Sequence, residues 1–197
     1  MVRRCNWANS SELMREYHDN EWGTPIYDDQ LLFEFLILEG AQAGLSWNTI
    51  LQKRENFRKA FDNFDFKKIA KYNEQKVEEL LNDAGIIRNR LKIEAVIVNA
   101  KVLLELQDEF SSFSNYIWEF IDFKPIINKF KILEELPSKT ELSVLISQDL
   151  KKQGFKFVGP TIIYSFMQAV GMTNDHIIDC FRFKEINQII KSGVNIK

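Results

Sequence analysis

The sequence predicts an all-α fold, and composition, apolar spacing and chain breakers all favour that class. The 197 residues include only 8 glycines and 4 prolines but 16 phenylalanines, a balance that favours helices over a turn-rich β fold. Apolar residues recur at helical spacing through most of the chain. With 45% hydrophobic residues, the chain can bury one substantial core or two small lobes that share one. No internal repeat or long linker divides it, which predicts a single domain over residues 1–197.

The first helical pattern is short and lies before residue 23. Strong breakers end it at Trp22-Gly23-Thr24-Pro25. Asp28 or Asp29 then provides the N-cap of a second helix. Residues 31–38 of that helix are apolar almost all round, which predicts burial on most of its sides.

Glu39 is the unusual residue of this second helix. A buried carboxylate without a partner is costly, so it either takes up a proton or pairs with a cation. Residues 40–44 contain two glycines and two alanines, which allow something to approach the backbone closely. Leu45 then stands alone on a turn, Ser46 is a good N-cap, and Trp47 opens the next helix. The group is as consistent with a pocket for a flat ligand as with a Glu39 that only caps a helix end or pairs with an arginine.

Further helices are predicted along the middle of the chain. Asn73 caps one that Gly85 closes, and longer ones are expected over residues 89–107 and 141–153, with a less regular piece over 111–123. A charged amphipathic helix precedes them over residues 48–61. Its basic residues are expected to form a solvated face: Lys53, Arg54, Arg58 and Lys59.

Two helices with a tight connection are predicted over about residues 141–171. Gly154 and Gly159 lie at the two ends of the connection, and Pro160 suits the first position of the second helix. Backbone amides at that helix N-terminus, beside Lys156, would form a site for an anion such as phosphate. An ordinary turn between two packed helices has the same pattern.

Charge and hydropathy exclude some classes of protein. A net charge of −2 argues against a strongly cationic protein that coats nucleic acid, although it allows a local basic patch. No apolar run is long enough to span a membrane, and the N-terminus lacks a signal-peptide core. We therefore expect a cytoplasmic protein without a membrane partner.

The chain contains only two cysteines and two histidines, and they form two pairs. Cys5 and His18 lie near the N-terminus, while His176 and Cys180 lie four residues apart on an expected last helix capped by Asn174 or Asp175. Two such pairs can supply the four ligands of a closed, structural zinc site that ties the chain ends together. A disulfide between the cysteines is the less favoured alternative in a reducing compartment.

Several blocks of the sequence resemble the DNA-3-methyladenine glycosylase I family, of the helix-hairpin-helix superfamily. The resemblance runs from Cys5 to Cys180, nearly the whole chain. Its most specific block is Leu38-Glu-Gly-Ala-Gln-Ala-Gly-Leu-Ser-Trp47. Other blocks are Cys5-Asn-Trp7, Tyr17-His-Asp-Asn-Glu-Trp-Gly23, Gly154-Phe-Lys-Phe-Val-Gly159, Tyr164-Ser-Phe-Met-Gln-Ala169 and Asn174-Asp-His176.

The resemblance implies two helical lobes with a helix-hairpin-helix motif, a base pocket between the lobes, and one structural zinc held by both pairs of ligands. It implies double-stranded DNA containing alkylated adenine as the partner, bound by a monomer. Glu39 and Tyr17 would hydrogen-bond a flipped base, Trp47 would stack on it, and Trp7 and Trp22 would complete the aromatic wall. The residues expected to contact the DNA are Gly44, Leu45, Lys156, Gly159 and Thr161.

The implied reaction is hydrolysis of the N-glycosidic bond of N3-methyladenine, which starts base excision repair. This base is cationic in DNA, so a carboxylate among aromatic rings suits it and little acid catalysis is needed. We expect no strand cleavage, because no lysine is placed to form a Schiff base. The alternatives are a zinc-stabilised DNA-binding module without catalysis and a metallohydrolase whose metal does the chemistry.

The chain departs from the family pattern at two positions. Met14 stands where we expect another aromatic, which bears on the pocket wall. Pro160 lacks an N–H that could meet a phosphate. Asp175 is interpreted as a helix cap, with catalysis as the minority view, and residues 181–197 have no functional interpretation.

Overall fold

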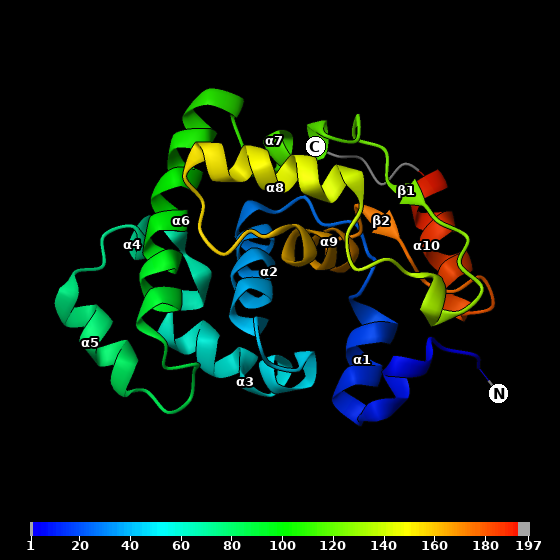
Figure 1. Ribbon diagram of the computed structural model, residues 1–197, viewed down its shortest axis with the longest axis horizontal. Helices are drawn as coiled ribbons and strands as arrows, with labels where there is room; N and C mark the ends of the chain where they lie inside the picture. The colour runs from blue at the N-terminus through cyan, green and yellow to red at the C-terminus, as the bar shows by residue number, and fades with distance from the viewer. Residues whose placement is uncertain (1, 193–197) are drawn as a thin grey trace.

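The computed structural model describes residues 2–192, and these are mostly helical (Figure 1). None of the helices in this part of the chain is long and apolar enough to cross a membrane. The α-helices are α1 (Glu12–Asn20), α2 (Asp29–Gln42), α3 (Trp47–Ala60), α4 (Phe66–Ile69), α5 (Glu74–Asn82), α6 (Arg90–Phe110), α7 (Phe113–Glu119), α8 (Glu141–Gln153), α9 (Pro160–Ala169) and α10 (Phe181–Lys191). Short 3-10 helices are η1 (Asn6–Ser10), η2 (Asp62–Phe64) and η3 (Leu133–Glu135).

Several predicted helix starts are confirmed by their caps. The side chains of Asp28, Ser46 and Asn73 each accept a hydrogen bond from a backbone N–H in the first turn of α2, α3 and α5. Such caps satisfy donors that the first turn of a helix leaves unpaired. The helix predicted over residues 141–153 is also confirmed, as α8.

Helix α2 is the centre of the molecule, as its apolar sequence predicts. It packs against α3, α6, α7 and α9, and its residues from Leu32 to Ala41 are all buried. In Figure 1 it stands between the α4–α6 side of the molecule and the side that holds α1 and α10. Gly40 allows the α8–α9 connection to approach, because a Cβ there would lie only 3.2 Å from Cβ of Phe157.

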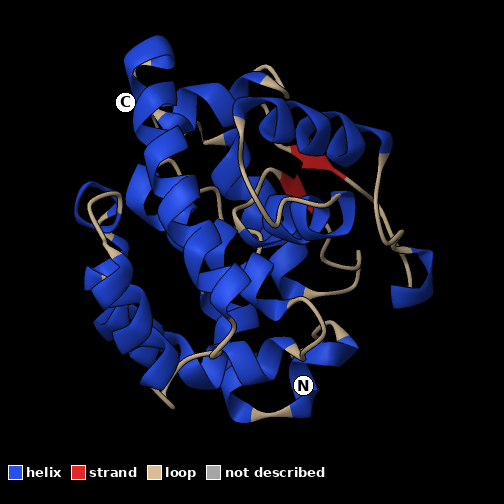
Figure 2. Ribbon diagram, turned by 60° about the vertical axis from the view of Figure 1, so that its left-hand side comes forward, coloured by secondary structure: helices blue, strands red, loops and turns tan. Residues whose placement is uncertain are grey.

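The prediction of an all-α chain is wrong in one detail. Ile126–Ile127 and Thr173–Asn174 form two short parallel strands, β1 and β2, with Ile126 opposite Thr173 (Figure 2). Two residues are too few to produce the alternating pattern that identifies a strand in a sequence.

The predicted last helix starts too early. Asn174 belongs to β2, and α10 begins only at Phe181, after a turn in which the N–H of Cys180 donates to the carbonyl of Ile177. Neither Asn174 nor Asp175 therefore caps a helix, and His176 and Cys180 do not share a helix face. Helix α10 instead accounts for much of the segment that follows Cys180.

The solvated basic face predicted for α3 is also wrong in part. Arg54 is 7% exposed, and its Nε donates to the Glu34 carboxylate on α2 at 2.5 Å. Arg58 reaches the same carboxylate at 2.8 Å. The pairing depends on how α2 packs against α3, which helical spacing within α3 does not reveal.

Candidate active site and metal cluster

A cavity of about 230 Å³ lies where α1, α2, α3, α9 and the η3 loop meet. It contains every aromatic residue predicted for the base pocket, together with Glu39. Its lining is formed by Trp7, Met14, Tyr17, Trp22, Glu39, Gln42, Trp47, Leu133, Leu136, Ser165 and Gln168.

Glu39 is buried in this cavity without a cationic partner. It is 4% exposed, and no basic side chain among residues 2–192 lies within salt-bridge distance of it. Burial raises the pKa of its carboxyl to about 8, because the charged form loses hydration. The two other roles considered for Glu39 are wrong. It does not cap the helix end, because α2 continues past it to Gln42, and it does not pair with an arginine, because Arg54 pairs with Glu34.

Tyr17 and Trp47 flank the acid with polar groups. Their ring centroids are 5.5 Å apart. Burial, and then the neighbouring Glu39, raise the pKa of the Tyr17 phenol well above its usual value. Trp47 Nε1 is buried without a hydrogen-bond partner in the described structure. An unpartnered donor and an unpartnered acid in the lining of one cavity indicate a site that a polar ligand completes.

Trp7, Trp22 and Met14 also line the cavity. Trp7 and Trp22 meet edge to face, with centroids 5.0 Å apart. Met14 is 9% exposed and contributes a flexible apolar side chain where an aromatic was expected.

Several cavity residues received no role from the sequence. Ser165 and Gln168 stand three residues apart, so one face of α9 presents both of them. That spacing, within a block shared with the family, was the signal that could have identified them. Gln42 carried the same signal, since it stands three residues after Glu39 on α2 within a shared block. Leu133 and Leu136 gave no comparable signal, because they reach the cavity from the irregular segment between α7 and α8.

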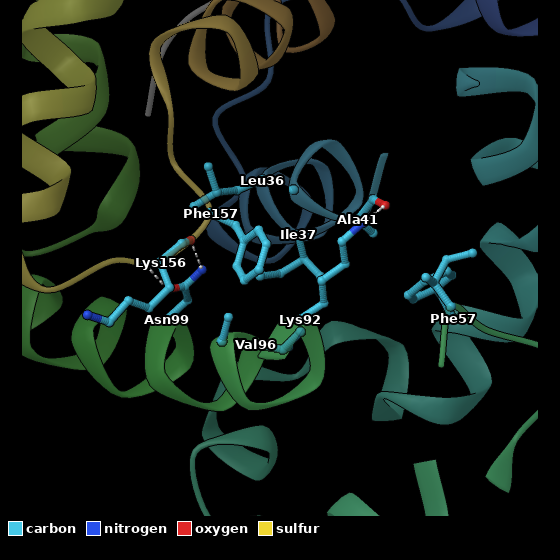
Figure 3. A pocket seen from close by; sticks show the side chains of 12 residues that line it. Leu36, Ile37, Ala41, Phe57, Lys92, Val96, Asn99, Lys156 and Phe157 are labelled. Carbon is cyan, nitrogen blue, oxygen red and sulfur yellow. Dashed lines mark hydrogen bonds between the residues drawn. The ribbon is translucent and has the colours of Figure 1, made fainter. Parts of the chain in front are cut away.

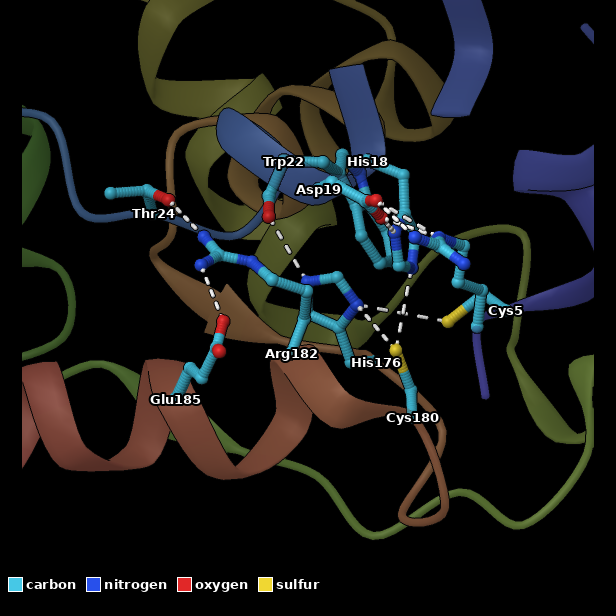
Figure 4. Close-up of polar contacts among 10 residues, drawn as sticks. Cys5, His18, Asp19, Trp22, Thr24, His176, Cys180, Arg182 and Glu185 are labelled. Carbon is cyan, nitrogen blue, oxygen red and sulfur yellow. Dashed lines mark hydrogen bonds and ion pairs between the residues drawn. The ribbon is translucent and has the colours of Figure 1, made fainter. Parts of the chain in front are cut away.

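The two predicted ligand pairs come together in one buried cluster (Figure 4). The ligand atoms of Cys5, His18, His176 and Cys180 all lie within 4.8 Å of one another. Cys180 Sγ is 3.4 Å from His18 Nε2 and 3.6 Å from His176 Nδ1, and Cys5 Sγ is 3.7 Å from His176 Nδ1. Both cysteines are free thiols, so the disulfide alternative is wrong.

This donor set fits a tetrahedral zinc ion. Zinc with bonds of about 2.3 Å to sulfur and about 2.0 Å to nitrogen separates its ligand atoms by roughly 3.3 to 3.8 Å. Each histidine also uses its second ring nitrogen, as metal-binding histidines do. His18 Nδ1 lies 2.7 Å from Asp19 Oδ1, and His176 Nε2 lies 3.0 Å from the carbonyl of Trp22.

The residues predicted to contact DNA lie outside the cavity, in two separate turns. Gly44 and Leu45 are exposed in the α2–α3 turn, where Gly44 has a φ of +82° that suits glycine. In the α8–α9 connection Lys156 is exposed and Gly159 is partly exposed, and Thr161 is exposed in the first turn of α9.

Helix α6 makes hydrogen bonds to both turns. These bonds lie around a second hollow, between α2 and α6 (Figure 3). The Lys92 ammonium donates to the carbonyls of Ala41 and Ala43, at 2.8 Å each. Asn99 accepts from the N–H of Lys156 at 2.8 Å and donates to its carbonyl at 3.0 Å. The two turns are therefore fixed to one helix.

Comparison with known proteins is consistent with this geometry. The sequence model described as methyladenine glycosylase matches residues 7–183. The chain is 49% identical over 179 residues to DNA-3-methyladenine glycosylase 1 of Escherichia coli (strain K12), covering 91% of this chain and 96% of that protein.

Solved structures give the same result. A crystal structure of 3-methyladenine DNA glycosylase I superposes with a TM-score of 0.88 at 50% identity, covering 91% of this chain and 98% of the other. A variant of 3-methyladenine DNA glycosylase I in complex with 3-methyladenine gives a TM-score of 0.88 at 34% identity, covering 90% and 96%.

The fold and the cavity define a helical glycosylase with an acid buried among aromatic rings. The chain belongs to the methyladenine glycosylase family.

Proposed function

We propose that this protein excises N3-methyladenine from alkylated double-stranded DNA and so starts base excision repair. The observation that carries the proposal is Glu39, an acid of raised pKa that is buried in an aromatic cavity without a cation. A cationic base supplies the missing partner. Neutral adenine does not, so the same carboxylate discriminates damaged from normal bases.

The chemistry follows from the charge of the substrate. Water attacks the sugar carbon as the N-glycosidic bond breaks, the bonding electron pair goes to the cationic base, and neutral 3-methyladenine leaves. The water oxygen stays on the sugar carbon as a hydroxyl group, and the proton that it loses passes to solvent. The positive charge of the bound base lowers the raised pKa of Glu39, so the acid gives its proton to solvent and then contacts the base as a carboxylate. Tyr17 hydrogen-bonds the base, while Trp47, Trp7 and Trp22 enclose it. No lysine lines the described cavity, which supports a monofunctional enzyme without strand cleavage.

The DNA is bound through the two turns that α6 holds. Flipping leaves a gap in the duplex, and Leu45, with Gly44 beside it, fills that gap from the exposed α2–α3 turn. Helices α8 and α9 act as a helix-hairpin-helix motif over about residues 141–171. Its connection offers Lys156, Gly159 and Thr161 to phosphates, with Pro160 contributing no donor. The chain acts as a single domain and as a monomer.

The cluster of Cys5, His18, His176 and Cys180 holds one structural zinc. Four protein ligands leave no position open for water, so the metal has no catalytic role. When bound, it would tie Cys5 and helix α1, which carries His18, to the segment before α10. The pKa of the Cys180 thiol lies far below its usual range, because Cys5, His176 and His18 hydrogen-bond its sulfur, and a thiolate is the form that binds zinc.

The test is release of free base from DNA that carries N3-methyladenine, measured by chromatography for the wild type, Glu39→Gln and Glu16→Gln. Glu16 is exposed on α1 and serves as the matched control. We expect Glu39→Gln to slow release by about 100-fold or more, since it removes the charge that binds the cationic base. Glu16→Gln should match the wild type.

A folded, zinc-loaded wild type that binds the DNA and releases nothing would overturn the enzyme assignment. The protein would then be a DNA-binding module without catalysis.

A further inference from the structure

Asp175 is a buried carboxylate whose bonding capacity is filled. It is 1% exposed. Its Oδ1 accepts from Asn128 Nδ2 and from Thr173 Oγ1, each at 2.7 Å. Its Oδ2 accepts from the Tyr164 hydroxyl at 2.5 Å and from Gln168 Nε2 at 2.8 Å. Four donors on two oxygens are the full complement of an ionised carboxylate, which can only accept.

This carboxylate fixes which way the Gln168 amide faces. The oxygen and nitrogen of a glutamine amide are nearly the same in shape, so the partner decides between the two orientations. Because Asp175 only accepts, Gln168 must direct Nε2 toward it and Oε1 away from it. The backbone at Gln168 is also held, since its carbonyl accepts from the N–H of Gly23 at 3.1 Å.

The fixed oxygen belongs to a residue that lines the base cavity. No donor among residues 2–192 bonds Gln168 Oε1. Gln168 is therefore a cavity-lining residue whose amide oxygen has a set orientation and is free to accept a hydrogen bond.

We infer that Gln168 determines specificity by accepting a hydrogen bond from the exocyclic amino group of an adenine-type base, and that Asp175 is its positioning residue. The inference rests on the proposed function. Adenine has an amino donor at position 6, whereas guanine has a carbonyl acceptor there. A guanine-type base would place that oxygen against Gln168 Oε1, and the site rejects it because two acceptors then face each other without a proton.

The experiment compares single-turnover release of 3-methyladenine and 3-methylguanine from DNA that carries each base. For Gln168→Met, which keeps the length of the side chain, we expect the adenine-to-guanine ratio of rates to fall by about 10-fold or more, because the variant removes the acceptor that distinguishes the two bases. Asp175→Asn should lower the ratio by less, because an asparagine can turn its own amide and so lets Gln168 turn. That variant leaves every side chain of the cavity wall unchanged, so it tests the inference even if Gln168→Met does not fold.

Gln107→Met is the matched control. Gln107 Nε2 also donates to an aspartate carboxylate, that of Asp29 at 2.6 Å, but Gln107 does not line the cavity. It should leave the ratio unchanged.

Two outcomes overturn different statements. If the wild type releases 3-methyladenine and Gln168→Met slows both bases equally, Gln168 has a structural role only and the inference is wrong. If the wild type releases neither base, the proposed function itself fails.

Discussion

Glu34 and Glu39 lie five residues apart on α2, and both are 4% exposed, yet their surroundings are opposite. Glu34 is held by Arg54 at 2.5 Å and by Arg58 at 2.8 Å. Glu39 has aromatic rings around it, and no cation in the described part of the chain pairs with it. Glu34 joins α2 to α3 through its arginine partners, while Glu39 is a buried acid that still lacks a cationic partner. Equal burial thus gives a structural residue in one place and a binding residue in the other.

The metal cluster resembles Glu34, because its buried polar groups are also partnered. Each of its histidines has partners for both ring nitrogens, and burial lowers the pKa of His176, which keeps that imidazole neutral as a ligand. Trp22 belongs to both sites, because its carbonyl bonds His176 while its ring lines the base cavity. The metal cluster, whose polar groups are all partnered, therefore holds in place a wall residue of the cavity that contains the unpartnered Glu39.

The largest effect is expected for Cys180→Ala, which removes one of the four metal ligands. Structural zinc contributes on the order of 10 kcal/mol to the folding of small zinc domains, so the variant should lose bound zinc and unfold far more easily. Metal analysis and thermal unfolding measure both. Asp179→Asn, at an exposed neighbour, is the control. Full stability without bound metal would contradict a structural zinc.

A smaller loss is expected when Glu34 loses its closest partner. Arg54→Met should destabilise the protein by about 3 to 5 kcal/mol, because it leaves a buried carboxylate with Arg58 as the only cation that pairs with it among residues 2–192. The variant also removes the ion pair between Arg54 and the more exposed Glu21. The measurement is unfolding by denaturant. Lys59→Met, exposed on the same helix, should change little. If Arg54→Met lowered the free energy of unfolding no more than Lys59→Met does, the pairing of Glu34 with Arg54 would not stabilise the protein, and the contrast with Glu39 would fail.

Glu39→Gln is expected to stabilise the protein without DNA, and the gain depends on pH. The folded pKa is raised to about 8 from an ordinary value of 4.5. The wild type is thus fully stable below the ordinary pKa and loses stability as the pH rises toward 8, while glutamine does not titrate. At pH 7 the gain should be roughly 2 to 3 kcal/mol. Unfolding free energies compared at pH 5 and pH 8 would contradict this if the difference did not grow.

Some of the fold and the site could be predicted from the sequence, and the limits are physical. The burial of α2 and the anomaly of Glu39 follow from one stretch of chain, since an acid in an apolar helix needs a reason. The contact between Glu34 and Arg54 could not be predicted, because it depends on how two helices pack. A spacing of four residues predicted that His176 and Cys180 lie close together, but it did not distinguish a helix from the turn that α10 follows.

The most direct test of the contrast is the pKa of Glu39 itself. A ¹³C NMR titration of the glutamate carboxyl carbons, with the Glu39 signal assigned by its loss in Glu39→Gln, gives this value. We predict a midpoint near 8 in the protein without DNA. A midpoint near 4.5, as in an exposed glutamate, would show that Glu39 is already solvated or paired, and the cavity would then have no unmet charge for a cationic base to supply.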